Sequence, residues 1–432
     1  MRITTNGAIK TKFGWSGSAA VAKIFEIIRI DGPITRLGLE NRTGISRSAI
    51  ALHVNVLQSI GLIKRIGGHI EGEGRRGRSF AVNESGGYFV GIDLDRTLER
   101  VSVGLFNLSL AIIGESSKVF PWHVMGQEKL MDQIILLIRR LLESYSVSEK
   151  RFWGIGVSVP APVNPQTGDI VFAPFLGRTQ DSSFSKLSRS FSCPIRVEND
   201  SNVMAMAEMG KGVARGVKDF IFLRVGHGVG AGIVAGGMLY RGFRGFSGEV
   251  GHTIFDGSSK VCVCGNQGCV ETEAGSDAVL EEAALLAKKD SGSYLAKHLD
   301  SYNGITLRDI GIAAGAGDEA CMKLIKKTGE ALGVAVSSLV NVLNPELIVV
   351  GGPTTDLGEM LLTSMRQSLM RRTLPQSTSE LVVRRTKLGD SIGMVGAAYM
   401  VQEDILSSKN VVKIIDQHKA GTLERRQRAR RK

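Results

Sequence analysis

The sequence predicts an α/β protein that carries a separate, smaller domain at its N-terminus. Apolar segments of strand length alternate with helical segments from Tyr88 onward, which is the pattern of an α/β domain. With 432 residues, of which 43% are hydrophobic, the chain is long enough for two or three domains. Similar strand-and-glycine segments near Asp93 and Gly226 suggest two matching halves. Strands are expected at 90–94, 101–105, 153–159, 195–198, 220–225 and 347–350, and helices at 129–144, 202–209, 277–288 and 319–342.

Residues 1–85 are expected to form a winged helix-turn-helix. Apolar residues recur at helical spacing over 21–28, which predicts a first helix. Two more helices are expected, one closed by Gly44 and one capped by Ser46. Two short strands then follow, at 62–63 and 79–82. Three helices and a hairpin in this order predict a winged helix-turn-helix.

The third of these helices carries the side chains that we expect to contact DNA. In a helix-turn-helix, the first residues of the recognition helix reach base edges in the major groove. The expected contacts on this helix are Ser46, Arg47, Ser48, Ala51 and Asn55. The wing adds three arginines interleaved with glycine, a composition that suits a narrow minor groove: Arg75, Arg76 and Arg78. A net charge of +12 agrees with a polyanionic partner. The alternative is an ordinary three-helix unit with a solvated polar face.

Three of the five cysteines follow a histidine closely in the sequence. His252, Cys262, Cys264 and Cys269 offer one imidazole and three thiolates, which is the ligand set of a closed tetrahedral zinc site. A closed site leaves no position for water, so the Zn2+ is expected to be structural. An odd number of crowded cysteines favours metal over disulfides in a reducing compartment. A chance cluster of free thiols is the alternative.

The same segment resembles the signature of the ROK family, which contains sugar-responsive repressors, uncharacterised reading frames and sugar kinases. The matching strings are 248–252, Gly-Glu-Val-Gly-His, and 262–269, Cys-Val-Cys-Gly-Asn-Gln-Gly-Cys. The resemblance extends over nearly the whole chain and includes the winged helix of the family's repressor branch. It implies that residues 86–408 form an actin-like, sugar-kinase-like domain of two α/β lobes, with sugar bound in the cleft between them. Residues 409–432 are expected to be a basic C-terminal tail.

The resemblance also implies a set of sugar ligands: Asn199, Asp200, Glu249, His252 and Glu271. Asp200 matches the general base of the kinases, which here would be vestigial. His252 would bind zinc through one ring nitrogen and face sugar with the other. For Asn199 and Asp200 the alternative is helix N-capping. Ala161 and Arg178 depart from the family's pattern, and Ala161 would be strained if its backbone needed a positive φ.

Kinase activity is not expected, because the first phosphate-binding turn of the kinases is altered. Their pattern, Asp-x-Gly-Gly-Thr, reads Asp93-Leu94-Asp95-Arg96-Thr97 here, and Asp95 would repel phosphate. The second glycine-rich segment, 226–232, is retained, either for nucleotide or for packing alone.

We therefore expect a cytoplasmic, sugar-responsive transcription regulator, most simply a repressor of carbohydrate genes. Its partners would be a double-stranded DNA operator and a sugar or sugar phosphate effector. It would bind as a homodimer or dimer of dimers, and no membrane is involved. An active ATP-dependent sugar kinase with a DNA-binding arm is one alternative. A regulator controlled by a protein partner, with no sugar ligand, is another.

Overall fold

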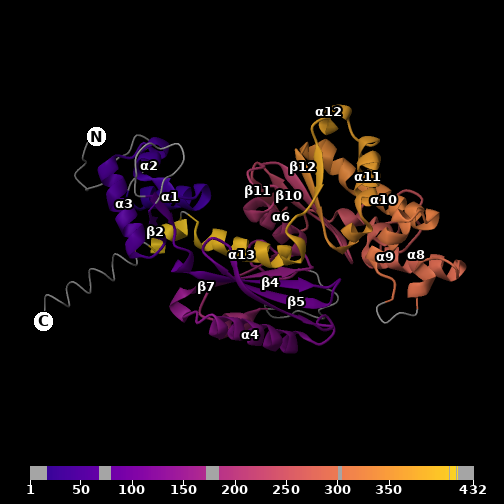
Figure 1. Ribbon diagram of the computed structural model, residues 1–432, viewed down its shortest axis with the longest axis horizontal. Coiled ribbons are helices and arrows are strands. Elements are labelled where there is room, and N and C mark those ends of the chain that lie inside the picture. The colour runs from indigo at the N-terminus through magenta and orange to yellow at the C-terminus, as the bar shows by residue number, and fades with distance from the viewer. Residues whose placement is uncertain are drawn as a thin grey trace.

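A computed structural model provides the structure of the protein (Figure 1) and describes residues 17–67, 79–171, 184–299, 304–407, 409–414 and 416. Its N-terminal domain has three helices, α1 (Gly17–Asp31), α2 (Arg36–Thr43) and α3 (Arg47–Ser59). A small sheet with the order β1-β3-β2 packs beside them: β1 (Ile34–Thr35), β2 (Ile63–Ile66) and β3 (Ser79–Val82). Apart from β1, these are the elements that the sequence predicts.

The rest of the chain contains two five-stranded sheets of identical topology. The first has the order β6-β5-β4-β7-β8 and the second the order β11-β10-β9-β12-β13. In each sheet the first three strands in the chain form an antiparallel meander, and the last two add in parallel. The domain is therefore a structural duplication, as the two similar segments suggested.

The strands and helices of the two lobes have these bounds. In the first sheet they are β4 (Tyr88–Asp95), β5 (Arg100–Asn107), β6 (Ile112–Val119), β7 (Phe152–Val159) and β8 (Ile195–Asn199); in the second, β9 (Phe220–Val225), β10 (Val229–Ala235), β11 (Met238–Tyr240), β12 (Leu347–Gly351) and β13 (Val382–Arg385). The helices are α4 (Gln127–Ser144), α5 (Ser185–Ser190), α6 (Asp200–Lys211), α7 (Glu271–Ala274), α8 (Ser276–Lys289), α9 (Leu307–Gly315), α10 (Glu319–Leu343), α11 (Glu359–Met370), α12 (Pro375–Thr378) and α13 (Ile392–Ile405).

Helices α6 and α13 lie between the two sheets (Figure 1), and their apolar residues form a common core with both. α13 packs directly on the backbone of the first sheet. A Cβ on Gly91 of β4 would lie 2.0 Å from the carbonyl oxygen of Met394, and one on Gly156 of β7 would lie 1.9 Å from that of Ala397. Glycine is therefore required at both positions, because no side chain fits beneath the helix.

The N-terminal domain rests on the far end of α13, as Figure 1 shows. Val401 and Leu406 are buried in the same apolar cluster as Ile28 of α1. Arg29 of α1 also forms an ion pair with Glu403 of α13. One helix thus runs from the space between the lobes to the N-terminal domain.

The first residues of the predicted tail belong to this contact. Residues 409–414 are helical, and Val411 is buried in the cluster that holds the N-terminal domain. The basic run at the end of the sequence lies outside the described residues. No helix in the described part of the chain is long and apolar enough to cross a bilayer.

Candidate functional site

Helix α3 exposes one polar face at the surface of the N-terminal domain. Its opposite face, with Ile50, Val54 and Leu57, is fully buried. Of the predicted DNA contacts, Arg47, Ser48 and Asn55 are exposed, and Ser46 and Ala51 are half-buried. The Arg47 side chain is 72% exposed and lies 3.5 Å from the Glu40 carboxylate. The predicted wing contacts Arg75, Arg76 and Arg78 lie outside the described residues.

Two details of α3 differ from the expectation. Ser46 occupies the N-cap position, but its side chain does not cap the helix. Its hydroxyl lies 3.3 Å from that of Ser48 instead, so both hydroxyls stay at the surface. Sequence reasoning also missed Leu52, which is 58% exposed on the face that presents Ser48 and Asn55. Leu52 follows Ser48 by one helical turn, so the spacing alone could have placed it on the same exposed face.

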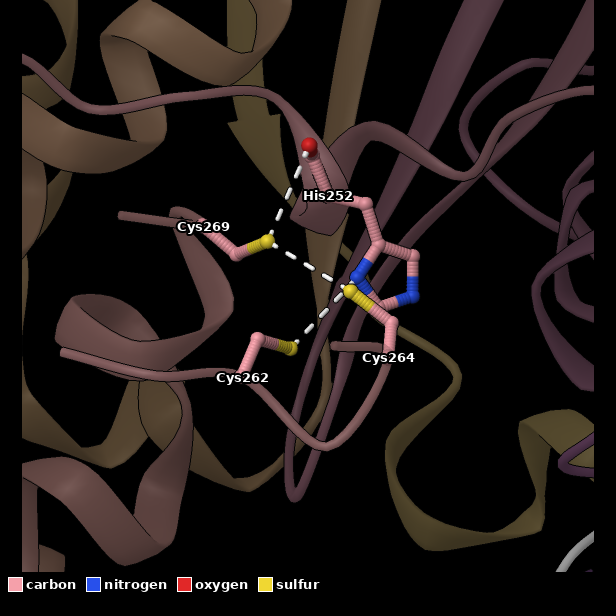
Figure 2. Close-up of side chains that lie close together, drawn as sticks. All are labelled: His252, Cys262, Cys264 and Cys269. Carbon is pink, nitrogen blue, oxygen red and sulfur yellow. Dashed lines mark hydrogen bonds between the residues drawn. The ribbon is translucent and has the colours of Figure 1, made fainter. Parts of the chain in front are cut away.

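The four predicted metal ligands converge on one point (Figure 2). Their ligand atoms all lie within 4.8 Å of one another. Cys262 Sγ is 3.7 Å from His252 Nδ1, and Cys264 Sγ is 3.7 Å from Cys269 Sγ. Thiolates 2.3 Å from a tetrahedral zinc would be separated by about 3.8 Å. The described residues therefore fit a four-coordinate metal ion with sulfur and imidazole ligands.

The chain makes this cluster with two short segments. His252 ends a 3₁₀ turn, Val250–His252, and the cysteines lie on the loop over 262–269. Gly265 and Gly268 have φ values of 94° and 82°, which side chains rarely adopt. Glycine at these two positions lets the loop fold back, so that Cys264 and Cys269 meet.

Two of the predicted sugar ligands, Glu249 and Glu271, lie beside the metal cluster, and a third, His252, belongs to it. The second ring nitrogen of His252, Nε2, is 3.9 Å from the Glu249 carboxylate. Glu271 accepts a hydrogen bond from the Val229 amide at 3.2 Å, and its other oxygen is 4.0 Å from Cys262 Sγ. Burial, with the charges of Asp200 and Glu271, raises the pKa of Glu249 to about 7. His252 thus offers Nδ1 to a metal while Nε2 faces the Glu249 carboxylate.

Asn199 and Asp200 begin α6 and have different local roles. Asn199 is the N-cap, and its side-chain oxygen accepts hydrogen bonds from the amides of Ser201 and Asn202 at 3.0 and 3.2 Å. The capping alternative is thus correct for Asn199. Asp200 is the first helical residue and is buried, with a carboxylate oxygen 3.0 Å from Arg224 Nε. Burial raises the pKa of Asp200, whereas Arg224 lowers it.

Of the two departures from the family pattern, one can be located. Ala161 is buried beside Asn199, whose side-chain amide donates to the Ala161 carbonyl at 3.4 Å. Its φ is not positive, so alanine causes no backbone strain at this position. The expected cost therefore does not arise. Arg178 lies outside the described residues.

The two turns that bind phosphate in kinases contact each other in this protein. The hydroxyl of Thr97, on the first turn, accepts a hydrogen bond from the His227 amide, on the second, at 2.9 Å. Arg224 lies beneath them, paired with Asp200 and 4.0 Å from Asp95. Sequence reasoning missed Arg224, although an arginine in the otherwise apolar strand over 220–225 is an available signal.

The Asp93 carboxyl is buried against α13, and burial, with the charge of Asp95, raises its pKa to about 7. In the unfolded chain Asp93 ionises near pH 4, so the folded protein holds an extra proton between about pH 4 and 7. This contribution to stability is complete below pH 4 and is lost as pH rises to 7. The free energy of unfolding of the unsubstituted protein should therefore fall as pH rises from 5 to 8, and that of Asp93→Asn should not. Over this range we expect the difference between the two to change by about 2–3 kcal/mol in favour of the variant.

Thermal unfolding measured from pH 5 to 8 checks this. Asp390→Asn is the control, because the Asp390 side chain is 82% exposed. Parallel curves for Asp93→Asn and the unsubstituted protein would contradict the assignment.

Comparisons with known proteins agree with this geometry. The sequence profile of the ROK family matches residues 100–404. A xylose repressor from Caldicellulosiruptor bescii is 32% identical over 337 residues, which are 77% of this chain and 83% of that protein. A glucokinase from Halalkalibacterium halodurans is 30% identical over 316 residues, 72% of this chain and 96% of that protein.

Among solved structures, a ROK family transcriptional regulator, described as a homologue of the E. coli MLC protein, has the same fold. It superposes with a TM-score of 0.79 at 24% identity and covers 92% of this chain and 99% of its own. The family profile, the repressor and the superposition all cover most of the two-lobed domain that holds the His/Cys cluster. The chain belongs to the ROK family.

Proposed function

We propose that this protein is a sugar-responsive DNA-binding transcription regulator that represses genes of carbohydrate metabolism. One observation carries the proposal. Helix α13 begins against Asp93, near the end of β4, and ends against α1 of the N-terminal domain. A chain that joins an exposed recognition helix to a ligand cleft through one helix has the parts of a ligand-controlled DNA reader. The xylose repressor among its relatives supports the same function.

The DNA-contacting residues would be those on the exposed face of α3. Arg47 can reach guanine acceptors or phosphate, and Ser46, Ser48 and Asn55 can donate to phosphate or bases. Leu52 and Ala51 offer apolar contact, which suits a thymine methyl group. The wing arginines Arg75, Arg76 and Arg78 would enter the adjacent minor groove. A homodimer or dimer of dimers would place two such helices on half-sites of a pseudo-palindromic operator.

The effector would bind in the cleft against Asn199, Asp200, Glu249, His252 and Glu271. Zinc at His252, Cys262, Cys264 and Cys269 would be structural, because four protein ligands leave no open position. It would fix the direction of the His252 ring and the position of Glu271. The oxygen of Asn199 is used in capping and one N–H of its side-chain amide donates to the Ala161 carbonyl, so the second N–H is the group available to a sugar hydroxyl.

Effector binding would be coupled to DNA binding through α13. The helix is fixed to the first sheet at Gly91 and Gly156, and to the N-terminal domain by Val401 and the pair Arg29–Glu403. A sugar that favours one arrangement of the lobes would therefore favour one placement of the recognition helices.

ATP-dependent phosphorylation is not part of this proposal. A kinase needs a general base and a held phosphoryl donor together. Asp200 is paired with Arg224, and the His227 amide already donates to Thr97.

Fluorescence anisotropy tests the function, with the full chain and DNA from the regions beside its gene. The titration is repeated with xylose, glucose, N-acetylglucosamine and the phosphate esters of the two hexoses. We expect one of these compounds to change operator affinity at least tenfold. Glu249→Gln should lose most of this response, because its carboxylate would accept sugar hydroxyls, while Glu319→Gln, on the exposed start of α10, should retain it. DNA binding that no sugar or sugar phosphate alters would leave the protein a regulator of another kind, and turnover of ATP would favour the kinase alternative.

A further inference from the structure

Arg224 is a buried cation beside Asp95 and Asp200, close to the second glycine-rich turn. It lies on β9, between Gly230 of β10 and Gly351 of β12, which are its partners on the neighbouring strands. A Cβ on Gly230 would lie 2.6 Å from the Ser201 hydroxyl, and one on Gly351 would lie 2.6 Å from the Phe222 ring, so other side chains occupy the space beside both glycines. The residue is only 6% exposed, and its guanidinium reaches the second glycine turn, where a Cβ on Gly226 would lie 3.1 Å from Nη1.

The charge of Arg224 is already matched by the protein. Its Nε lies 3.0 Å from Asp200, and its Nη2 lies 4.0 Å from Asp95. Asp93 is a third acid in the same buried group and influences the same arginine. Burial lowers the pKa of Arg224, whereas these carboxylates raise it, and the net shift is upward. No positive charge is left over for an anionic ligand.

Arg96 is a second cation near the glycine-rich turns, and acidic side chains also balance its charge. Arg96, on the turn that follows β4, faces Asp277 and Glu271. The Asp277 carboxylate also accepts from His227 Nδ1 at 2.7 Å. Acidic groups therefore surround both arginines, and a further anion would meet more negative than positive charge.

The backbone donors that a glycine-rich turn offers to phosphate are also engaged. The amide of Gly226 donates to the Gly228 carbonyl at 3.0 Å, and that of His227 donates to Thr97. The amide of Val229 donates to the Glu271 carboxylate. Such amides are the usual anion-binding groups of these turns. A phosphate here would have to displace three internal hydrogen bonds.

From this arrangement we infer that the cleft takes an uncharged sugar and rejects the phosphate ester of that sugar, with Arg224 and its acid partners as the specificity-determining group. The inference rests on the proposed function and narrows it. A sugar hydroxyl at Asp200 lies next to Arg224, so a phosphate on that hydroxyl would project into the paired group. A dianion would there be buried beside the Asp95 and Asp200 carboxylates, while Arg224 is already paired with both, which is costly.

Matched pairs of compounds test the inference on the full, zinc-loaded protein. Operator affinity is titrated with glucose and glucose 6-phosphate, with N-acetylglucosamine and its 6-phosphate, and with xylose. We expect the active compound to be a neutral sugar, with its ester at least thirtyfold weaker. An ester that acts at equal or lower concentration than its parent sugar would overturn the inference while the proposed function stands. If no compound acts, the proposed function fails and the inference fails with it.

A variant identifies the group responsible. The Leu98 amide donates a hydrogen bond to the Asp95 carboxylate at 3.0 Å. Asp95→Asn keeps an oxygen that can accept this bond and removes one negative charge beside Arg224. The preference for the neutral sugar over its ester should fall at least fivefold. Asp390→Asn, at the exposed partner of Arg100, is the matched control and should leave the preference unchanged. A preference that Asp95→Asn also leaves unchanged would show that the Arg224 group does not set it.

Discussion

Replacing Cys262 by serine is expected to abolish tight zinc binding and to lower the melting temperature of the protein by at least about 5 °C. The four predicted ligands join two separate segments, and a bound structural metal would contribute its binding free energy to folding. Cys262 is the ligand nearest the sugar-facing groups, at 3.7 Å from His252 Nδ1 and 4.0 Å from a Glu271 oxygen. Its loss should therefore free both His252 and Glu271 and also weaken the response to sugar. Metal analysis of the purified protein and calorimetric unfolding measure the two effects.

Cys193→Ser is the matched control for this substitution. Cys193 is a half-buried free cysteine next to β8, away from the metal cluster. It should keep one equivalent of zinc and a nearly unchanged melting temperature. If Cys262→Ser kept its zinc, or if the unsubstituted protein contained no more than a trace, the four residues would be a cluster of thiols and not a metal site.

The elements that the sequence predicts correctly are those whose signals are local. In the N-terminal domain, each helix has an apolar stripe and a residue that starts or ends it, such as Gly44 after α2. The strand β1 was missed because two residues, Ile34 and Thr35, carry no periodicity. It exists only through its pairing with Phe80 and Ser79 of β3.

Three of the elements missed in the two lobes lack a local signal: the edge strands β6 and β13 and the buried helix α13. Strands β6 and β13 lie at sheet edges with most of their residues exposed or half-buried, so their sequences lack an apolar run. Helix α13 has the opposite character. It is buried between two sheets over most of its length and shows no single apolar stripe. Its small residues allow close packing, which a periodicity argument does not detect.

In the candidate site, too, the residues that form a local motif could be predicted, and those brought together by the fold could not. The metal ligands lie within 18 residues of sequence and are recognisable as a motif, so their convergence could be predicted. Arg224 is paired with Asp95 and Asp200, which come from two other elements, and only the fold of the two lobes brings these three together. The close contact between the phosphate turns is likewise tertiary, since Thr97 and His227 are 130 positions apart.

Reversing the charge of Arg47, by Arg47→Glu, is expected to reduce operator affinity at least a hundredfold. Arg47 is the first residue of α3, and its side chain is 72% exposed, so the change costs little folding stability. A glutamate there removes a cation that reaches phosphate or guanine and adds an anion facing the DNA backbone. The dependence of affinity on salt should also become shallower, because fewer counterions are released on binding. Anisotropy titrations at several salt concentrations measure both effects.

Comparison with two other variants separates a contact from a general charge effect. Arg139→Glu changes net charge equally, on the exposed side of α4 in the other domain, and should alter affinity only slightly. Arg47→Gln removes the cation without adding an anion. Its operator affinity should fall about tenfold, which is less than for Arg47→Glu and more than for Arg139→Glu. Equal losses for Arg47→Glu and Arg139→Glu would mean that net charge, and not α3, dominates DNA binding. Unchanged sugar binding by Arg47→Glu, measured by calorimetry, would place the defect at the DNA, because the proposed sugar ligands and the His/Cys cluster lie in the other domain.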